Sequence, residues 1–335
     1  MLLGTAKVSS PWRQRILGMV KRHGVILPLM LIIAAAAILE PSFSTASNFA
    51  NILRQAAVLG IVCLGVTFVM MTGSLDLSVG SILSLCSVFA IHSMNTLAWT
   101  PTPVGAPLIM SVTVLLGALV GVINGVLIAV LKGRLGETFI ITYGMQIVVA
   151  SVALLYSGGQ FVAGTFRSLP YETIGTGYYP IIIFFSLAAL MHIVLSMTVF
   201  GRRLAFIGSN MDCARMSGIR VGSVRAFAYA ISGACSAVAA MIVTSRVNSA
   251  SPLQGVGYEL EAIAAIVVGG TSLTGGEGGI INTVVGVLIL SVLGNALNVM
   301  GIGANTQLVV RGTIIVAAVA LDTWNKAFAS KGYRA

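Results

Sequence analysis

Charged residues are scarce in this chain. Asp, Glu, Lys and Arg make up 8% of its 335 residues, whereas 57% are hydrophobic, and the mean hydropathy is +1.00. A soluble domain carries about 25% charged residues, because a compact body of this size needs a charged surface. The composition therefore excludes an ordinary soluble enzyme and predicts an integral membrane protein.

Among the charged residues, acidic residues are fewer than basic ones. The 9 Asp and Glu stand against 19 Lys and Arg, for a net charge of +10. Such a basic excess suggests nucleic-acid binding, but the bases form clusters between apolar runs and no single stripe. That distribution is typical of membrane orientation signals, and we expect no nucleic-acid partner.

Motifs for chemistry are missing as well. No GxxxxGK[ST] loop occurs, and none of the five lysines follows a glycine, so the chain lacks the usual cradle for ATP phosphates. The three histidines and four cysteines are too widely spaced for a metal site, and no CxxC pair occurs. We expect no enzymatic activity and no cofactor in this chain. Three of the four cysteines fall inside apolar runs, which favours small buried core residues.

Apolar intervals long enough to cross a bilayer follow one another along the whole chain. About 20 apolar residues span a membrane as a helix, and two overlong intervals are divided at the Pro-rich stretch 99–107 and at Gly301–Asn305. The result is an all-α polytopic fold in a single transmembrane domain, 1–335, with a basic N-terminal segment over 1–24. About ten helices are predicted, at 25–39, 52–72, 79–98, 106–131, 138–156, 179–199, 225–244, 259–271, 280–300 and 306–325.

Orientation follows from the bases in the short loops, which accumulate on the cytoplasmic side. With ten spans, fifteen bases fall inside and four fall outside or near outer helix ends, namely Arg54, Arg167, Arg246 and Arg311. Both termini are therefore predicted to be cytoplasmic. A cleaved signal peptide over 1–39 is the alternative, although no small-residue cleavage pattern follows the apolar run.

The eighth span, 259–271, is weak. It is shorter than the bilayer core and ends in a Gly-rich stretch, so we expect it to be a full span or a broken helix. That stretch resembles residues 72–81 in spacing, with Ser74 and Gly80 corresponding to Ser272 and Gly278. Interrupted segments at corresponding positions of an internal repeat indicate a transport pathway.

Polar residues inside the spans are candidates for that pathway or for its gate. Asp76 is costly if it faces lipid, so either Asp76 or Ser78 caps the following helix or Asp76 takes part directly in the substrate path. Asn124 and Asn295 bind a polar solute or, equally well, a neighbouring helix. Three glycines at Gly117, Gly121 and Gly125 share one helix face and predict close helix packing. The candidate pathway set is Asp76, Ser78, Gly80, Asn124 and Asn295.

A polar element over 201–223 separates two spans on the cytoplasmic side. Asn210 is placed to cap a short helix, Asp212 complements its positive end and Gly218 is placed to end it. Ala214, with Met211 and Ser217, then forms a small surface for a partner. Alternatively, the arginines of this element only hold lipid phosphates.

Several segments, in order over nearly the whole chain, resemble one known family. They include Leu75–Gly80, Gly208–Ile219, Gly257–Ala265, Gly269–Leu273 and Asn295–Asn298. The family comprises the permease subunits of ATP-binding-cassette importers for ribose, xylose, arabinose, galactose, allose and autoinducer-2. Ser74 and Glu277 depart from the usual pattern.

This resemblance implies a function and partners. The chain would form a translocation pathway for a monosaccharide or related polar solute in the bacterial inner membrane, and the solute itself is not readable. A tandem ATPase subunit would bind ATP-Mg and seat on a coupling helix defined by Gly208, Asn210, Ala214, Ser217 and Gly218. A periplasmic sugar-binding protein would deliver the solute and dock on Arg167 and Arg246, and a second copy or a paralogous permease would complete the pathway.

Two other classes of function stay open. An ion-coupled secondary transporter needs ionisable groups within the membrane, and only Asp76, Glu259, Glu261 and Arg311 qualify. A membrane-embedded enzyme has less support, because no nucleophile–base or metal constellation is present.

Overall fold

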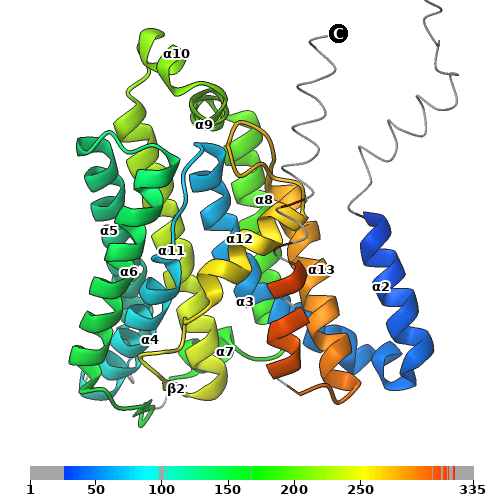
Figure 1. The fold of residues 1–335 in the computed structure, drawn as a ribbon. Coiled ribbons are helices and arrows are strands. Elements are labelled where there is room, and N and C mark those ends of the chain that lie inside the picture. The colour runs from blue at the N-terminus through cyan, green and yellow to red at the C-terminus, as the bar shows by residue number, and fades with distance from the viewer. Residues whose placement is uncertain are drawn as a thin grey trace, which may run out of the picture.

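The computed structural model describes residues 26–97, 102, 104–166, 168–303, 305–310, 312–314, 316 and 320. This part of the chain is a bundle of mainly parallel and antiparallel helices (Figure 1). A single short antiparallel pair within it joins β1 (Val162–Ala163) to β2 (Ser249–Ala250). The polytopic helical fold class is therefore confirmed.

Among the described residues, seven helices are long and apolar enough to cross a membrane. They are α3 (Ala46–Met71), α4 (Val79–Thr96), α5 (Gly105–Val130), α6 (Leu135–Ser157), α8 (Tyr179–Met197), α11 (Val221–Val247) and α13 (Ile280–Val299). Each overlaps a predicted span. The shorter elements are α2 (Ile26–Leu39), η1 (Pro41–Ser44), α7 (Leu169–Ile174), α9 (Val199–Ser209), α10 (Met211–Met216) and α12 (Tyr258–Val268).

The count of about ten spans stays a prediction. α2 has 14 residues and α12 has 11, so both are shorter than a full span. Half of the tenth predicted range, 306–325, and the whole N-terminal segment 1–24 lie outside the described residues. The segment 201–223 is largely helical, since it covers most of α9, all of α10 and the start of α11.

The centre of the bundle is α11, which packs against α3, α4 and α5. The predicted glycine face makes the tightest of these contacts. A Cβ on Gly117 would overlap the Gly233 backbone, and one on Gly121 would overlap the carbonyl group of Tyr229. Small residues let two backbones approach closely in this way, so the packing interpretation of Gly117, Gly121 and Gly125 is confirmed.

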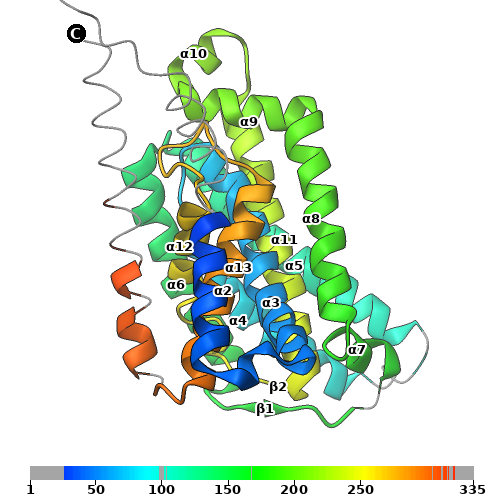
Figure 2. The same ribbon diagram turned by 90° about the vertical axis from the view of Figure 1, so that its right-hand side faces the viewer.

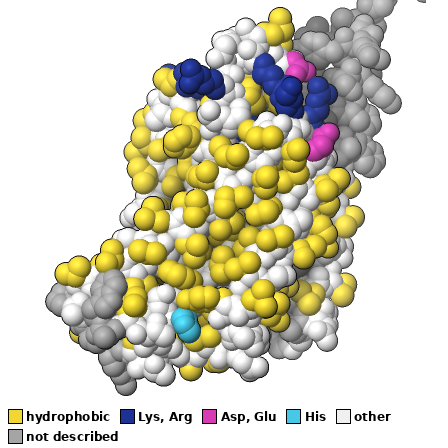
Figure 3. All heavy atoms as spheres, turned by 90° about the vertical axis from the view of Figure 1, so that its left-hand side faces the viewer, with side chains coloured by type: hydrophobic (Ala, Val, Ile, Leu, Met, Phe, Trp, Pro, Cys, Tyr) yellow, Lys and Arg dark blue, Asp and Glu magenta, His cyan; other side chains and the backbone are white. Residues whose placement is uncertain are grey.

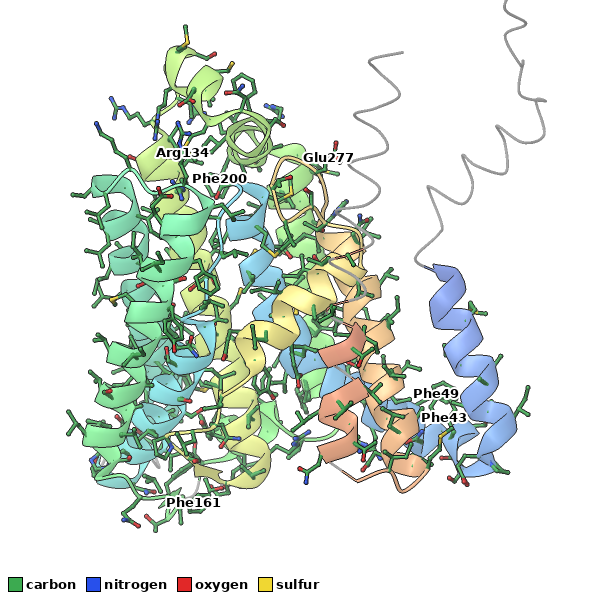
Figure 4. The ribbon with its side chains drawn as sticks, in the orientation of Figure 1. Phe43, Phe49, Arg134, Phe161, Phe200 and Glu277 are labelled. Carbon is green, nitrogen blue, oxygen red and sulfur yellow. The ribbon has the colours of Figure 1, made fainter. Side chains whose placement is uncertain are left out.

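The two ends of the bundle differ in charge. The end that carries α9 and α10, here called the α10 end, also carries Arg134 (Figure 4). On the face shown in Figure 3, the basic side chains gather at that end, above a broad hydrophobic surface. The opposite end, here called the β end, carries β1, β2 and α7 (Figure 2). This distribution has the asymmetry that the loop charges predict.

Candidate functional site

The connection between α3 and α4 is buried and not helical. Residues 73–78 carry the chain from the top of α3 to α4, whose first residue lies deep inside the protein (Figure 1). Non-helical backbone at membrane depth requires partners for its polar groups. Here Thr138 accepts from the Leu75 amide at 3.3 Å, Thr142 accepts from the Leu77 amide at 3.2 Å, and the Tyr229 hydroxyl donates to the Leu75 carbonyl at 2.7 Å.

Three predicted pathway residues meet at this segment. Oδ1 of Asp76 accepts from the backbone and side chain of Ser78, at 3.1 and 2.6 Å, and Oδ2 accepts from the Ser232 hydroxyl at 2.9 Å. The Asn124 amide donates to the Ser78 hydroxyl at 2.6 Å. Asp76 thus binds the amide of Ser78, the residue that directly precedes α4. The Ser78 side chain itself makes no cap bond. All three side chains are fully buried.

Gly80 lies where the N-terminal ends of α4 and α12 meet. A Cβ at this position would overlap the carbonyl oxygen of Gly255 and the carboxylate of Glu259. The Ser84 hydroxyl accepts from the Gly255 amide at 2.9 Å, and Glu259 Oε1 accepts from Gln146 at 3.0 Å. The beginnings of α4 and α12 therefore lie side by side in the interior.

Asn295 lies elsewhere. Its side chain exchanges two hydrogen bonds with Asn48, at 2.8 and 2.9 Å, and joins α13 to α3. Both amides are buried, and the pair sits beside the small apolar cluster around Phe43 (Figure 4). For Asn295 the structure therefore favours interhelical bonding over a role in the pathway.

The weak eighth span is interrupted. α12 covers about 16 Å at 1.5 Å per residue, against a bilayer core of about 30 Å, and residues 269–279 follow it without helix. This second non-helical stretch touches the first, because the Gly276 amide donates to the Met71 carbonyl at 3.1 Å and Gly275 packs on Gly73. The internal repeat itself stays a prediction.

A polar groove of about 340 Å³ opens between α3, α12, α13 and the last turn of α11. Its polar lining comes from residues that the sequence did not single out together: Gln55, Arg246, Tyr258, Glu261 and Ser291. Hydrophobic periodicity cannot reveal this groove, because its residues come from four helices far apart in the sequence. A mixed polar and apolar groove of this size fits a small hydrophilic solute.

The two predicted docking arginines have different outcomes. Arg246 belongs to the last turn of α11 and not to a loop, and it is exposed at the β end. It lines a second, smaller groove with Arg54, Gln55 and Gly175–Gly177, so two of the four exceptional arginines lie close together. Arg167 and Arg311 lie outside the described residues.

The short helix at the α10 end has the predicted caps. Asn210 Oδ1 accepts from the amides of Asp212 and Cys213 at 3.1 and 2.9 Å. Gly218 ends the helix with φ of +77°, a conformation that glycine adopts without strain, and the Ser217 hydroxyl donates to the Cys213 carbonyl at 2.9 Å.

Ala214 does not form the expected surface. It is fully buried in the main core cluster, because the i and i+4 geometry of α10 turns it toward α9 and α11. The outward face carries Asp212, Cys213, Arg215, Met216 and Ser217, of which Met216 is 88% exposed. A partner would therefore contact this face and not Ala214.

Gly208 connects α9 to the end of α3 and to the non-helical stretch 269–279. A Cβ on Gly208 would overlap the carbonyl oxygen of Met71 and the backbone of Gly275 and Gly276. In addition, Arg225 near the start of α11 donates to the Ser74 hydroxyl at 2.8 Å and to the Gly133 carbonyl at 2.7 Å. α9 thus contacts the non-helical stretch 269–279, and the start of α11 contacts the segment 73–78.

Comparison with known proteins identifies relatives over nearly the whole chain. Residues 48–319 match the family described as branched-chain amino acid transport system / permease component. The ribose import permease protein RbsC of Bacillus subtilis (strain 168) is 39% identical over 318 residues, which cover 91% of this chain and 94% of the relative. The galactose/methyl galactoside import permease protein MglC of Escherichia coli (strain K12) is 34% identical over 90% of this chain and 94% of its own length.

No solved structure matches the chain. The family match covers well over half of the sequence and agrees with the multi-pass helical fold. The chain therefore belongs to this family of membrane-spanning permease components, together with the ribose and galactose import permeases.

Proposed function

We propose that the chain is the membrane subunit of a bacterial ATP-binding-cassette importer and forms the path of a monosaccharide or related polar solute through the inner membrane. The observation that carries this proposal is the contact of Gly208 with the end of α3 and with the non-helical stretch 269–279. A partner that moves the exposed α10 would move α9, and through Gly208 it would displace the buried segments beside the pathway.

The partners follow from the two ends of the bundle. A tandem ATPase that binds ATP-Mg would seat on the outward face of α10 in the cytoplasm, and a periplasmic sugar-binding protein would dock at the β end near Arg54 and Arg246. Two copies of the chain, or this chain and a paralogue, would enclose the pathway. Both termini would then be cytoplasmic, as the positive-inside rule requires.

The solute class is supported by the groove and by the relatives. The family description mentions branched-chain amino acids, but the two relatives import sugars. Gln55, Tyr258, Glu261 and Ser291 supply several donors and acceptors for hydroxyl groups. A branched aliphatic side chain offers no donor or acceptor to this polar lining, whereas the hydroxyl groups of a sugar offer several.

Uptake measurements test this function. The chain is produced with its ATPase and binding protein in cells without their own sugar permeases, and uptake of labelled ribose, galactose and leucine is compared. We expect uptake of a sugar that stops when ATP is depleted and continues when a protonophore removes the ion gradient. Uptake that follows the ion gradient would favour the ion-coupled secondary transporter instead.

A native cysteine tests the orientation and the coupling surface. Cys213 is exposed on α10, whereas Cys63, Cys86 and Cys235 are buried. In cells that make the chain alone, an impermeant maleimide should label Cys213 only after permeabilisation, and the Cys213→Ser variant should not label. In permeabilised cells, production of the ATPase should shield Cys213. Labelling of intact cells would reverse the topology, and unchanged labelling with the ATPase bound would place the coupling surface elsewhere.

A further inference from the structure

A third groove lies at the α10 end and is larger than the two grooves described above. It is a groove of about 730 Å³ between α9, the end of α10 and the first three turns of α11. Figure 2 shows α9 lying across the ends of the long helices α8 and α11. The groove therefore begins at the surface of the bundle and continues along α11.

The lower part of this groove is apolar. Phe200, Val224, Phe227 and Ile231 line it, and Phe227 is 67% exposed. Phe200 stacks on the buried Phe68 at 6.2 Å and meets the ring of Phe227 edge-on at 6.4 Å. The aromatic wall is thus fixed to the core on one side and open on the other.

The upper part is basic. Arg203 and Arg220 line it with the hydroxyls of Ser217 and Ser223, and no carboxylate lines the groove. Within the described residues the only ion pairs join Asp212 to Arg134 and Arg215, so Arg203 and Arg220 have no acidic partner there. Two exposed guanidinium groups above an apolar slot form a site for an amphiphile with an anionic head.

We propose that this groove binds one anionic phospholipid, with its phosphate on Arg203 and Arg220 and an acyl chain along Phe227 and Ile231. The leaflet would be the cytoplasmic one under the orientation proposed above, but the binding itself requires only that the chain spans a membrane. Basic pockets between transmembrane helices on the cytoplasmic side are known to hold such headgroups.

Depth distinguishes a lipid from a soluble partner. From Arg220 to Ile231 the groove follows α11 for 11 residues, or about 16 Å at 1.5 Å per residue. This length extends well into the hydrocarbon core from the surface, where a water-soluble ATPase does not reach and an acyl chain does. A second copy fits poorly, because a two-fold contact would bring identical arginine pairs together.

Quenching by brominated lipid tests the proposal. In the full-length chain, Trp12, Trp99 and Trp324 are replaced by Phe, and Phe227→Trp supplies a reporter inside the groove. The protein is reconstituted with mixtures of phosphatidylglycerol and phosphatidylcholine, of which one or the other is brominated. The ratio of quenching gives the relative affinity of the two lipids for the reporter site.

We expect phosphatidylglycerol to be preferred at the Phe227→Trp reporter by roughly five-fold for each arginine that contacts the phosphate. The preference should disappear with Arg203→Gln and Arg220→Gln together. The matched control is Arg202→Gln, which removes the same charge one residue away but lines a different groove with His192 and Gly276. A second reporter, Ile140→Trp, lies on an exposed side of α6 away from the groove (Ile140 is 70% exposed) and should show no preference.

Two results would overturn the proposal. Equal quenching by both lipids at the groove reporter would show ordinary bulk lipid and no specific site. Absence of quenching by either lipid would show that a second copy of the chain covers the groove. Because uptake is not measured, neither result depends on whether the importer function is correct.

Discussion

The carboxylate of Asp76 accepts a hydrogen bond from the hydroxyl of Ser232 at 2.9 Å, which joins the buried non-helical segment to the middle of α11. The other oxygen of Asp76 accepts twice from Ser78. Both carboxylate oxygens are therefore engaged within the chain. This arrangement indicates that Asp76 holds the segment in place.

Asp76→Ala should prevent stable folding, because three buried donors would lose their acceptor at about 1–3 kcal/mol each. Asp76→Asn keeps one acceptor oxygen, and the Ser232 hydroxyl can accept from its new amide group, so this variant should fold and transport. The measurements are the yield of monodisperse protein in detergent and the rate of solute uptake. An Asp76→Asn variant that folds normally without transporting would instead assign the carboxylate a chemical role in ion coupling.

A methyl group on Gly80 should loosen the junction of α4 and α12. The added Cβ overlaps the Gly255 carbonyl and the Glu259 carboxylate, and overpacking costs about 1–3 kcal/mol. We expect a lower thermal unfolding temperature for Gly80→Ala in detergent. Gly144→Ala on α6 is the control, because no atom lies within 4 Å of its added Cβ. Equal unfolding temperatures would show that the two helix starts are free to separate.

The helices and the caps of α10 could be predicted because their signals are local. Apolar run length, Pro and Gly breaks, and an Asn and a Gly at the correct spacing each act within a few residues. The gap at 73–78 and the shortness of the eighth span were predictable for the same reason. Their mutual contact was not, because it joins Gly275 and Gly276 to Gly73 and Met71, which lie more than 150 positions away in the sequence.

Side-chain direction was harder to predict than position. For Asn295 the sequence leaves a bound solute and a neighbouring helix equally possible, because its partner Asn48 lies 247 residues away in the sequence. The short capped helix predicts a partner surface formed by Ala214 with Met211 and Ser217, yet a small residue equally suits a buried helix contact. The lining of the polar groove depends on which faces of four helices converge, and the nearly all-round hydrophobicity of membrane helices conceals those faces.

Substitution of the exposed Met216 should weaken ATPase binding, whereas substitution of the buried Ala214 should affect folding. Met216→Glu changes a side chain that is 88% exposed, so we expect normal folding, loss of ATPase association and loss of transport. Ala214→Arg forces a large charged group into the core cluster, which is costly, and should lower the amount of folded protein. Co-purification of the ATPase and the membrane level of each variant give the two readouts. Full ATPase recovery with Met216→Glu would assign α10 to the lipid surface.

Filling the polar groove should block the solute. Ser291→Trp places a large ring between α3, α12 and α13, and we expect uptake to fall at least about ten-fold with normal membrane insertion, because the solute would lose its space in the groove. The matched variant Ile281→Trp lies on the same helix at a position that is 61% exposed and should transport normally. Normal uptake by both variants would place the pathway outside this groove.

The arginines at the β end provide the last prediction. Arg54 and Arg246 line one small groove there, and guanidinium groups pair with carboxylates in a bidentate geometry. Replacement of either by Glu should increase the concentration of binding protein needed for half-maximal uptake, and the effect should shrink in high salt as screening increases. Arg246 also lines the polar groove, so a change in its variant alone could reflect altered solute passage. Arg54 does not line that groove, and its variant therefore isolates docking: if Arg54→Glu and Arg246→Glu both leave the dependence on binding-protein concentration unchanged, these residues do not receive the binding protein and only contact headgroups.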